Sequence, residues 1–273
     1  MAVTNFIQTI WSKKIQDALE LKCKLVQNCL RDYEGDAKYA HTVKILGVGE
    51  PTIRAYNKNT GIEPEAMKDV GQELVIDQAN AFAFLVDDID KAQSVPGLAE
   101  EYQRKAVHGL AVARDTYISH LMGTTTNIVS SDSAEDGNIG RSIKEAIDKG
   151  IVFLREKNFD EDGVIEITPK MYNYFKNYLI TTSTNNPELI AKGIVGMYDG
   201  FEVVMSNNLP TAGTPLACIR GKKAIAFAGQ INEVEAFRSD KYFADVVRGL
   251  DTFGAKVIDP NRIVMVDMVC LEF

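Results

Sequence analysis

The feature that most constrains the fold of this chain is a pair of extended segments separated by a polar stretch. Residues 42–45 alternate in polarity as a β-strand does, Gly47 and Gly49 then predict a bend or bulge, and residues 52–56 resume the extended pattern. After the polar stretch, residues 74–86 return with large apolar side chains on one parity. Together these segments predict a long β-hairpin.

Such a hairpin has no core of its own. An arm of about fourteen residues reaches roughly 45 Å at about 3.3–3.4 Å per residue, and an isolated two-stranded ribbon is at best marginally stable in water. The ribbon must therefore lie on another surface. If its own subunit does not cover it, that surface belongs to a neighbouring copy, so the hairpin is a first sign of assembly.

Two long helices flank this hairpin in the sequence. Residues 6–29 carry apolar side chains at helical spacing. A second helix begins near Ser94 and Pro96, runs to residue 122 before Gly123, and spans roughly 40 Å at about 1.5 Å per residue. Its predicted apolar stripe consists of Leu98, Tyr102, Ala106, Leu110, Ala113, Tyr117 and Leu121.

The rest of the chain first alternates helices with strands and then consists mainly of strands. After a polar loop at 124–140, helices are predicted at 142–157 and from Pro169 onward, with strands at 164–167 and 201–205. This alternation favours a compact module around a small sheet. Further strands are predicted at 224–227, 234–238, 245–250, 255–258 and 263–271. The expected class is α+β.

Composition excludes several functions. The net charge of −8 comes without a basic stripe, which argues against binding nucleic acid by phosphate neutralisation, although an acidic subunit can still line a DNA-filled container. No secretory signal and no run of about 18 apolar residues is visible, so no membrane association is expected. The scattered cysteines are expected to be reduced; they are Cys23, Cys29, Cys218 and Cys270.

No pattern predicts catalysis. The three histidines His41, His108 and His120 are not spaced to chelate one ion, and no nucleophile elbow or phosphate loop is present. The acidic run at Asp87, Asp88 and Asp90 has carboxylates that could hold Mg²⁺. The same residues also suit the end of a strand before a helix, which is the favoured interpretation. We therefore expect no catalytic, cofactor-binding or metal-binding residues.

Three stretches resemble a known family when taken in order. They are residues 74–93 (LVIDQANAFAFLVDDIDKAQ), residues 193–210 (GIVGMYDGFEVVMSNNLP), and residues 234–238 (VEAFR) followed by 247–257 (VRGLDTFGAKV). Together they resemble the major capsid proteins of tailed bacteriophages, which have the Hong Kong 97-type fold. The order of elements agrees with that family over almost the whole chain.

The resemblance implies a subunit with an N-terminal arm, an extended loop formed by a β-hairpin, a peripheral domain with a long spine helix, and an axial domain. It places these parts at 1–41 (arm), 42–91 (extended loop), 92–123 (spine helix), 124–215 (axial domain), 216–258 (peripheral strands) and 259–273 (a last strand returning to the axial domain).

The implied function is that of a coat protein that self-assembles into hexamers and pentamers of an icosahedral shell. Its implied partners are other copies of itself, a separate scaffolding protein, a portal, and packaged double-stranded DNA bound without sequence specificity. It is expected in the virion capsid, after assembly in the cytoplasm of the bacterial host. Repeated contacts around closed symmetry suit this reading of a projecting hairpin and a rigid helix.

The expected assembly interface lies on the extended loop, which should cover an adjacent subunit. Apolar loop residues would be buried there, and charged ones would pair across the contact and set its register. The expected residues are Ile53, Arg54, Tyr56, Lys58, Lys68, Glu73, Leu74 and Ile76. Some relatives cross-link lysine to asparagine between subunits, but no acidic catalyst for Lys58 or Lys68 is apparent in the sequence.

Two alternatives remain open. An encapsulin-like nanocompartment has the same fold but encloses protein cargo, so packaged DNA distinguishes the two. A metal-dependent phosphoryl-transfer enzyme would use Asp87, Asp88 and Asp90. It predicts that Asp88→Ala abolishes activity and leaves assembly intact, whereas the capsid reading predicts a defect in assembly or folding.

Overall fold

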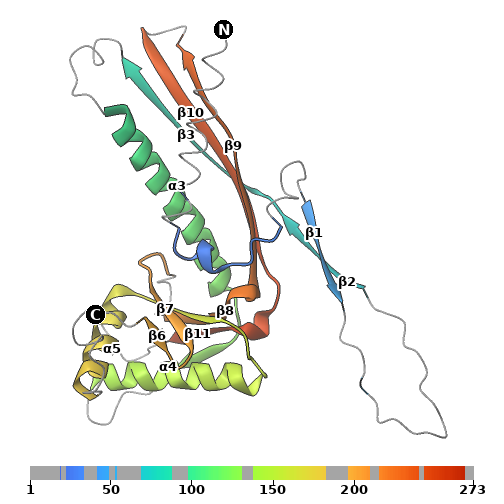
Figure 1. Cartoon of the computed structure of the whole chain (residues 1–273), viewed down its shortest axis with the longest axis vertical. Helices are drawn as coiled ribbons and strands as arrows, with labels where there is room; N and C mark the ends of the chain where they lie inside the picture. Colours follow the sequence, from blue (N-terminus) through green and yellow to red (C-terminus); the bar gives the residue numbers. More distant parts are fainter. Residues whose placement is uncertain are drawn as a thin grey trace, which may run out of the picture.

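The computed structural model describes residues 19, 23–33, 42–48, 53, 69–87, 98–130, 138–182, 196–209, 215–239 and 243–267. These ranges form an elongated three-stranded sheet, a six-stranded sheet at one end of it, and a two-stranded hairpin to the side (Figure 1). One hydrophobic cluster lies between helix α3 and the three-stranded sheet, a second fills the six-stranded module, and a small third lies under the hairpin. The expected α+β class is confirmed.

The three-stranded sheet is antiparallel in the order β3 (Gln78–Asp87), β10 (Ala244–Val257) and β9 (Ile225–Arg238). The four short strands expected between 224 and 258 are two strands of 14 residues each, with one irregularity between Leu250 and Asp251. A glycine within β10 makes room for an aromatic ring of β3. A Cβ at Gly249 would lie 2.5 Å from the ring of Phe82.

The structure describes the base of the predicted hairpin. Strand β1 (Thr42–Val48) pairs antiparallel with β2 (Asp69–Val75), so the described part of each arm has seven residues and spans about 23 Å. The rest of the predicted first arm, apart from Ile53, lies outside the described residues. The expected single return strand over 74–86 is wrong, because the chain changes partner after β2 and continues as β3 along β10. Gly47 pairs regularly with Val70, so the described part of β1 has no bulge there.

The base of the hairpin is covered by its own subunit. Val43, Ile45 and Leu74 pack against Ala226 and Ala228 of β9. The backbones of β10 and β2 also approach closely at Gly254, where a Cβ would lie 2.1 Å from the carbonyl oxygen of Val75. A short strand pair thus gains the hydrophobic surface that it lacks by itself.

Helix α3 (Leu98–Gly123) has 26 residues and a length of about 39 Å, as expected for the long helix. Its expected apolar stripe is rotated: Tyr102 is 48% exposed, and the predicted capping residues Ser94 and Pro96 lie outside the described residues. The buried positions are Val107, Leu110, Ala111, Arg114, Asp115, Ile118, Ser119 and Met122. The stripe was misplaced because two of these positions carry charges that pair inside the protein.

The six-stranded sheet has the order β4-β11-β8-β5-β7-β6. Its strands are β4 (Ile128–Ser130), β11 (Ile263–Asp267), β8 (Pro215–Gly221), β5 (Gly163–Ile167), β7 (Phe201–Met205) and β6 (Met197–Tyr198). The pairs β4–β11 and β5–β7 are parallel and the others antiparallel. Helices α4 (Ile139–Glu156) and α5 (Pro169–Thr182) pack on it and agree with expectation.

Three strands of this sheet were not predicted. Strand β4 lies in the expected loop at 124–140, the two-residue strand β6 lies at the edge of the sheet, and β8 lies near its centre between β11 and β5. The expected boundary between modules at 215/216 is therefore wrong, because β8 belongs to the six-stranded sheet. The short 3-10 turns η3 (Lys222–Ala224) and η4 (Pro260–Arg262) connect the two sheets.

The expected helix over residues 6–29 does not extend to Cys29. Residues 23–33 form a bent segment with one 3-10 turn, η1 (Val26–Asn28), and a single parallel bridge from Leu30 to Ala226 of β9. Leu19 is helical, and residues 1–18 and 20–22 lie outside the described residues. The helical pattern fails here because side chains from elsewhere bind the backbone groups that a helix would pair internally.

Candidate assembly surface

The structure divides the predicted interface residues into three groups. Ile53 is 96% exposed, and Glu73 on β2 is also exposed. Leu74 is fully buried against β9, and Ile76 packs half-buried on the same cluster, so both are corrected from contacts with a neighbour to contacts within the chain. Arg54, Tyr56, Lys58 and Lys68 lie outside the described residues.

Polar contacts reinforce the base of the hairpin. Lys256 of β10 donates from Nζ to the carbonyl oxygen of Glu73 at 2.9 Å, and Gln72 donates from Nε2 to the carbonyl oxygen of Ile258 at 3.2 Å. Both bonds join β2 to the end of the three-stranded sheet. They fix the direction in which the hairpin leaves the body (Figure 1).

The face of the three-stranded sheet that points away from α3, hereafter the outer face, carries an exposed apolar row. Leu85, Val246 and Phe237 stand directly opposite one another on β3, β10 and β9. Leu85 and Phe237 are 46% and 42% exposed, and Phe243, just before β10, is 83% exposed. Large apolar groups gathered in this way favour a protein contact over solvent.

The next row on the outer face combines a charge pair with a small side chain. Ala83, Arg248 and Glu235 stand opposite one another, and Arg248 pairs with Glu235 at 2.6 Å. The Arg248 guanidinium also lies 4.9 Å from the centroid of the Phe237 ring. Ala79, like Ala83, is exposed and carries only a methyl group. A face with small side chains on β3, an apolar row and one charge pair suits the docking of another polypeptide.

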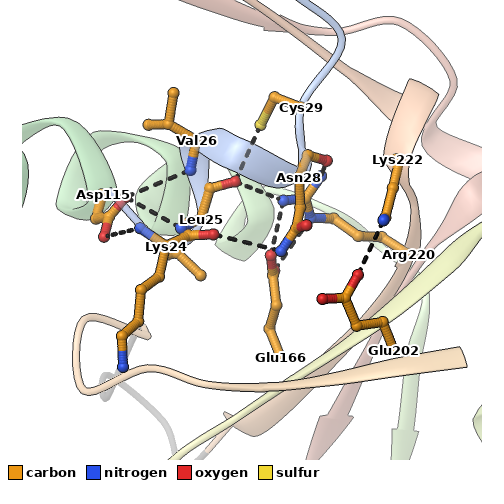
Figure 2. Close-up of polar contacts among 10 residues, drawn as sticks. All are labelled: Lys24, Leu25, Val26, Asn28, Cys29, Asp115, Glu166, Glu202, Arg220 and Lys222. Carbon is orange, nitrogen blue, oxygen red and sulfur yellow. Dashed lines mark hydrogen bonds and ion pairs between the residues drawn. The ribbon is translucent and has the colours of Figure 1, made fainter. Parts of the chain in front are cut away.

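A second constellation joins the two modules through residues 23–33, hereafter the strap. The carboxylate of Asp115 on α3 accepts backbone N–H groups from Lys24 at 3.0 Å, Leu25 at 3.1 Å and Val26 at 3.4 Å (Figure 2). Burial raises the pKa of Asp115, and the hydrogen bonds from the strap oppose that rise. Asp115 therefore ties the strap to the long helix.

The opposite side of the strap binds Arg220 of β8. This guanidinium donates to the carbonyl oxygens of Asn28 at 2.6 Å and Leu25 at 2.9 Å. It also forms two hydrogen bonds with Glu166 of β5, at 3.0 Å and 2.7 Å, and both side chains are fully buried (Figure 2). Burial raises the pKa of Glu166 against the pull of Arg220. The fork geometry of arginine satisfies strap and sheet together.

A third buried charge pair fixes α3 to the three-stranded sheet. Arg114 donates from Nε to Asp251 of β10 at 3.0 Å and makes a second bond to the same carboxylate. Its guanidinium also lies 5.5 Å and 5.7 Å from the ring centroids of Phe227 and Phe253. The pair sits where the β9–β10 register shifts. Arg114 and its neighbour Asp115 thus attach one helix to two different partners.

The acidic run offers no assembled site in the described residues. Asp87 is the last residue of β3, opposite Ala244, while Asp88 and Asp90 lie outside the described ranges. Among the residues that the structure describes, no group of three histidine, cysteine or acidic side chains is placed to hold a metal ion. None of the helices within those ranges is long and apolar enough to span a membrane.

No family model matches the sequence, and no curated protein matches it either. Solved structures do. A structure from Mycobacterium phage Che8 is 25% identical with a TM-score of 0.70, covering 89% of this chain and 90% of that one. The capsid structure of cyanophage P-SCSP1u is 15% identical with a TM-score of 0.69, covering 88% and 86%. The chain has the Hong Kong 97-type capsid fold.

The same fold extends to a different kind of particle. A virus-like particle from Pyrococcus furiosus is 12% identical with a TM-score of 0.60, and the match covers 96% of this chain and 99% of that one. The Hong Kong 97-type fold is therefore shared over nearly the full length of each of these chains. At such identities the likeness to the cyanophage and Pyrococcus structures concerns the fold alone.

In this Hong Kong 97-type chain, the sequence analysis missed the charged residues that bind the strap and connect the two modules. Asp115, Glu166 and Arg220 were not singled out, and their buried positions break the apolar pattern by which a core is recognised. One signal was available. Glu166 interrupts an otherwise apolar strand, and a charge at such a position requires a buried partner.

Proposed function

We propose that this chain is the major capsid protein of a tailed bacteriophage and builds an icosahedral shell of hexamers and pentamers around double-stranded DNA. The observation that carries the proposal is the length of the match. The phage structures and this chain cover one another over 86–90% of their lengths. In a shell protein the fold is itself the functional unit, because assembly is the activity.

We assign the parts of the capsid fold to the elements of this chain by their order in the sequence. Helix α3 is the spine helix, the three-stranded sheet is the peripheral domain, and the six-stranded sheet with α4 and α5 is the axial domain. The β1–β2 hairpin is the base of the extended loop, and the strap belongs to the N-terminal arm. The exposed outer face and the exposed Ile53 and Glu73 support a subunit that overlaps its neighbours.

The interface proposed for the extended loop contains Ile53, Arg54, Tyr56, Lys58, Lys68 and Glu73. Leu74 and Ile76 are left out because they pack within the chain. A separate scaffolding protein and a portal are the further partners, and packaged DNA is held without sequence-specific contacts. Assembly takes place in the cytoplasm of the bacterial host, and the chain ends in the virion capsid without enzymatic activity.

Electron microscopy with sedimentation velocity tests the proposal directly. The purified chain, alone and with its scaffolding protein, should give closed shells, tubes or capsomer rings. A species that stays monomeric at high concentration, with crowding agent and with scaffolding protein, would contradict it. In that event Asp88→Ala should be assayed for loss of a phosphoryl-transfer activity.

The second candidate is a nanocompartment shell with protein cargo, favoured by the match to the virus-like particle from Pyrococcus furiosus. The contents of purified particles separate the two functions. Nuclease-protected DNA of uniform length supports the phage capsid. A stoichiometric co-purifying protein inside DNA-free particles supports the nanocompartment.

A further inference from the structure

The strap contacts both modules with the same few peptide groups. Leu25 donates its N–H to Asp115 on α3 and gives its carbonyl oxygen to Arg220 on β8. Lys24 adds a side-chain bond from Nζ to the carbonyl oxygen of Met205 on β7, at 3.0 Å. The strap is therefore a cross-link between the long helix and the six-stranded sheet that uses no covalent bond (Figure 2).

The covalent links between the two modules are short. They are residues 124–127 between α3 and β4, residues 222–224 between β8 and β9, and residues 258–262 between β10 and β11. A few residues in such connections are enough to absorb a change of angle between two modules. The strap braces this junction in addition to the direct packing of α3 on β11, because it holds the end of α3 against β8 and β5.

The two attachments of the strap, to Asp115 and to Arg220, differ in the number and length of their hydrogen bonds. Arg220 is fully buried, paired twice with Glu166, and bonded to two strap carbonyl oxygens. Asp115 holds the other side through backbone N–H groups at 3.0–3.4 Å, with a further side-chain bond to Asn208. Both contacts are charge-assisted, but the bonds of Arg220 are shorter, at 2.6–3.0 Å, so we expect the contacts of Asp115 to open first.

We propose that the strap is a releasable brace: docked on Asp115 it fixes the angle between α3 and the six-stranded sheet, and released from Asp115 it permits a second angle while Arg220 keeps it on β8. The brace is a property of the single chain and does not depend on the proposed function. If the chain is a shell subunit, as proposed above, a second angle lets one sequence fit both five-fold and six-fold rings.

The buried cysteines report on the state of the strap. Cys23 and Cys29 lie on it, and Cys218 lies beneath it on β8. Burial raises the pKa of Cys23 to about 12 and that of Cys29 to about 11. Because the thiolate is the reactive form, maleimide labels these thiols only after the strap opens. Cys23 follows Asp115 most directly, while Cys218 stays covered as long as Arg220 holds.

The first experiment compares labelling rates at each cysteine by peptide mass spectrometry in the unassembled full chain. Asp115→Asn and Asp115→Ala should raise the rate at Cys23 about tenfold or more and the rate at Cys218 by less than about threefold. Glu101→Gln, which removes an exposed carboxylate from the same helix, is the matched control and should change neither rate. Equal acceleration at both thiols indicates general unfolding and overturns the proposal, as does an unchanged Cys23 rate.

The second experiment measures the angle itself. Spin labels at Glu101→Cys on α3 and Lys149→Cys on α4 report the separation of the modules by pulsed electron resonance, in a background whose four native cysteines are replaced by alanine. That background with Asp115 intact should give one distance, and Asp115→Asn should add a second. A single unchanged distance, together with faster labelling of Cys23, would show that the strap opens without bracing the modules. That result also overturns the proposal, and it leaves the proposed shell function untouched.

Discussion

The six-stranded and three-stranded sheets differ in how many of their faces the chain itself covers. In the six-stranded sheet all five residues of β5 are buried, because α4 and α5 cover one face and the strap and α3 cover the other. In the three-stranded sheet α3 covers one face, while among the described residues the hairpin covers the end of the other face that lies nearest the six-stranded sheet. The first unit is complete within one chain. The second needs a partner to complete it, and this is what an assembling subunit requires.

The largest loss of stability should come from breaking the buried Arg220–Glu166 pair in the six-stranded sheet. Arg220→Ala leaves Glu166 buried without a cation and should lower the free energy of unfolding by about 3–5 kcal/mol. Urea denaturation followed by circular dichroism measures the loss. The matched control is Lys222→Ala, whose exposed pair with Glu202 should be worth about 1 kcal/mol or less. Similar losses in the two variants would show that burial does not set the value of the pair.

The next effect concerns the base of the hairpin, the one place where the outer face is already covered. Leu74→Ala removes a fully buried side chain and should cost about 2–4 kcal/mol, together with faster proteolysis within the hairpin. Val75→Ala, one residue along and 42% exposed, is the control and should cost less than about 1 kcal/mol. Equal costs would place Leu74 outside the subunit core.

A smaller effect is expected at alkaline pH from the thiols between the two units. Cys29 has a pKa raised from the usual 9.0 to about 11 by burial, so the folded protein favours the neutral thiol. Its stabilising contribution is complete below pH 9 and falls as pH rises through 11, by about 1 kcal/mol at pH 10. Urea titrations at pH 8 and pH 10 measure the fall. Cys29→Ala should show a flatter pH dependence, and an identical slope would contradict the prediction.

The smallest effect on stability should occur on the uncovered outer face. The double variant Leu85→Ser and Phe237→Ser should change the free energy of unfolding by less than about 1 kcal/mol. It should nevertheless raise the concentration needed for assembly about tenfold, measured by light scattering. Val152→Ser, on the exposed side of α4 in the completed unit, is the control and should leave assembly unchanged. Assembly defects of equal size would remove the distinction between the two sheets.

Elements that depend on local pattern were predictable from the sequence. Helix α5, with Met171, Phe175 and Leu179 on its buried side, and strands β5 and β7 follow from spacing and turn signals alone. The division into arm, extended loop, peripheral domain and axial domain came from the family resemblance and stays a prediction. Of the expected interface, the structure shows exposed Ile53 and Glu73 and places Leu74 inside the chain.

What escaped prediction depends on contacts distant in the sequence. The strap forms no helix as far as Cys29 because Asp115 and Arg220, about 90 and 195 positions away, take its backbone groups. Strand β8 was not among the predicted strands, and its buried Arg220 departs from the apolar pattern expected of a central strand. The change of partner between β2 and β3 is decided by β10, which follows far later in the chain. Local periodicity contains none of this information.

The mode of attachment of the strap has a consequence for how such a sequence can diverge. Asp115 and Arg220 recognise peptide groups that every residue except proline supplies, so the strap is bound without regard to most of its side chains. These contacts constrain the backbone of the strap and not the side chains that it carries, whereas Asp115, Glu166 and Arg220 must be inherited as a set. Ancestry in this region would therefore be recorded in the three residues that bind the strap, and only faintly in the strap itself.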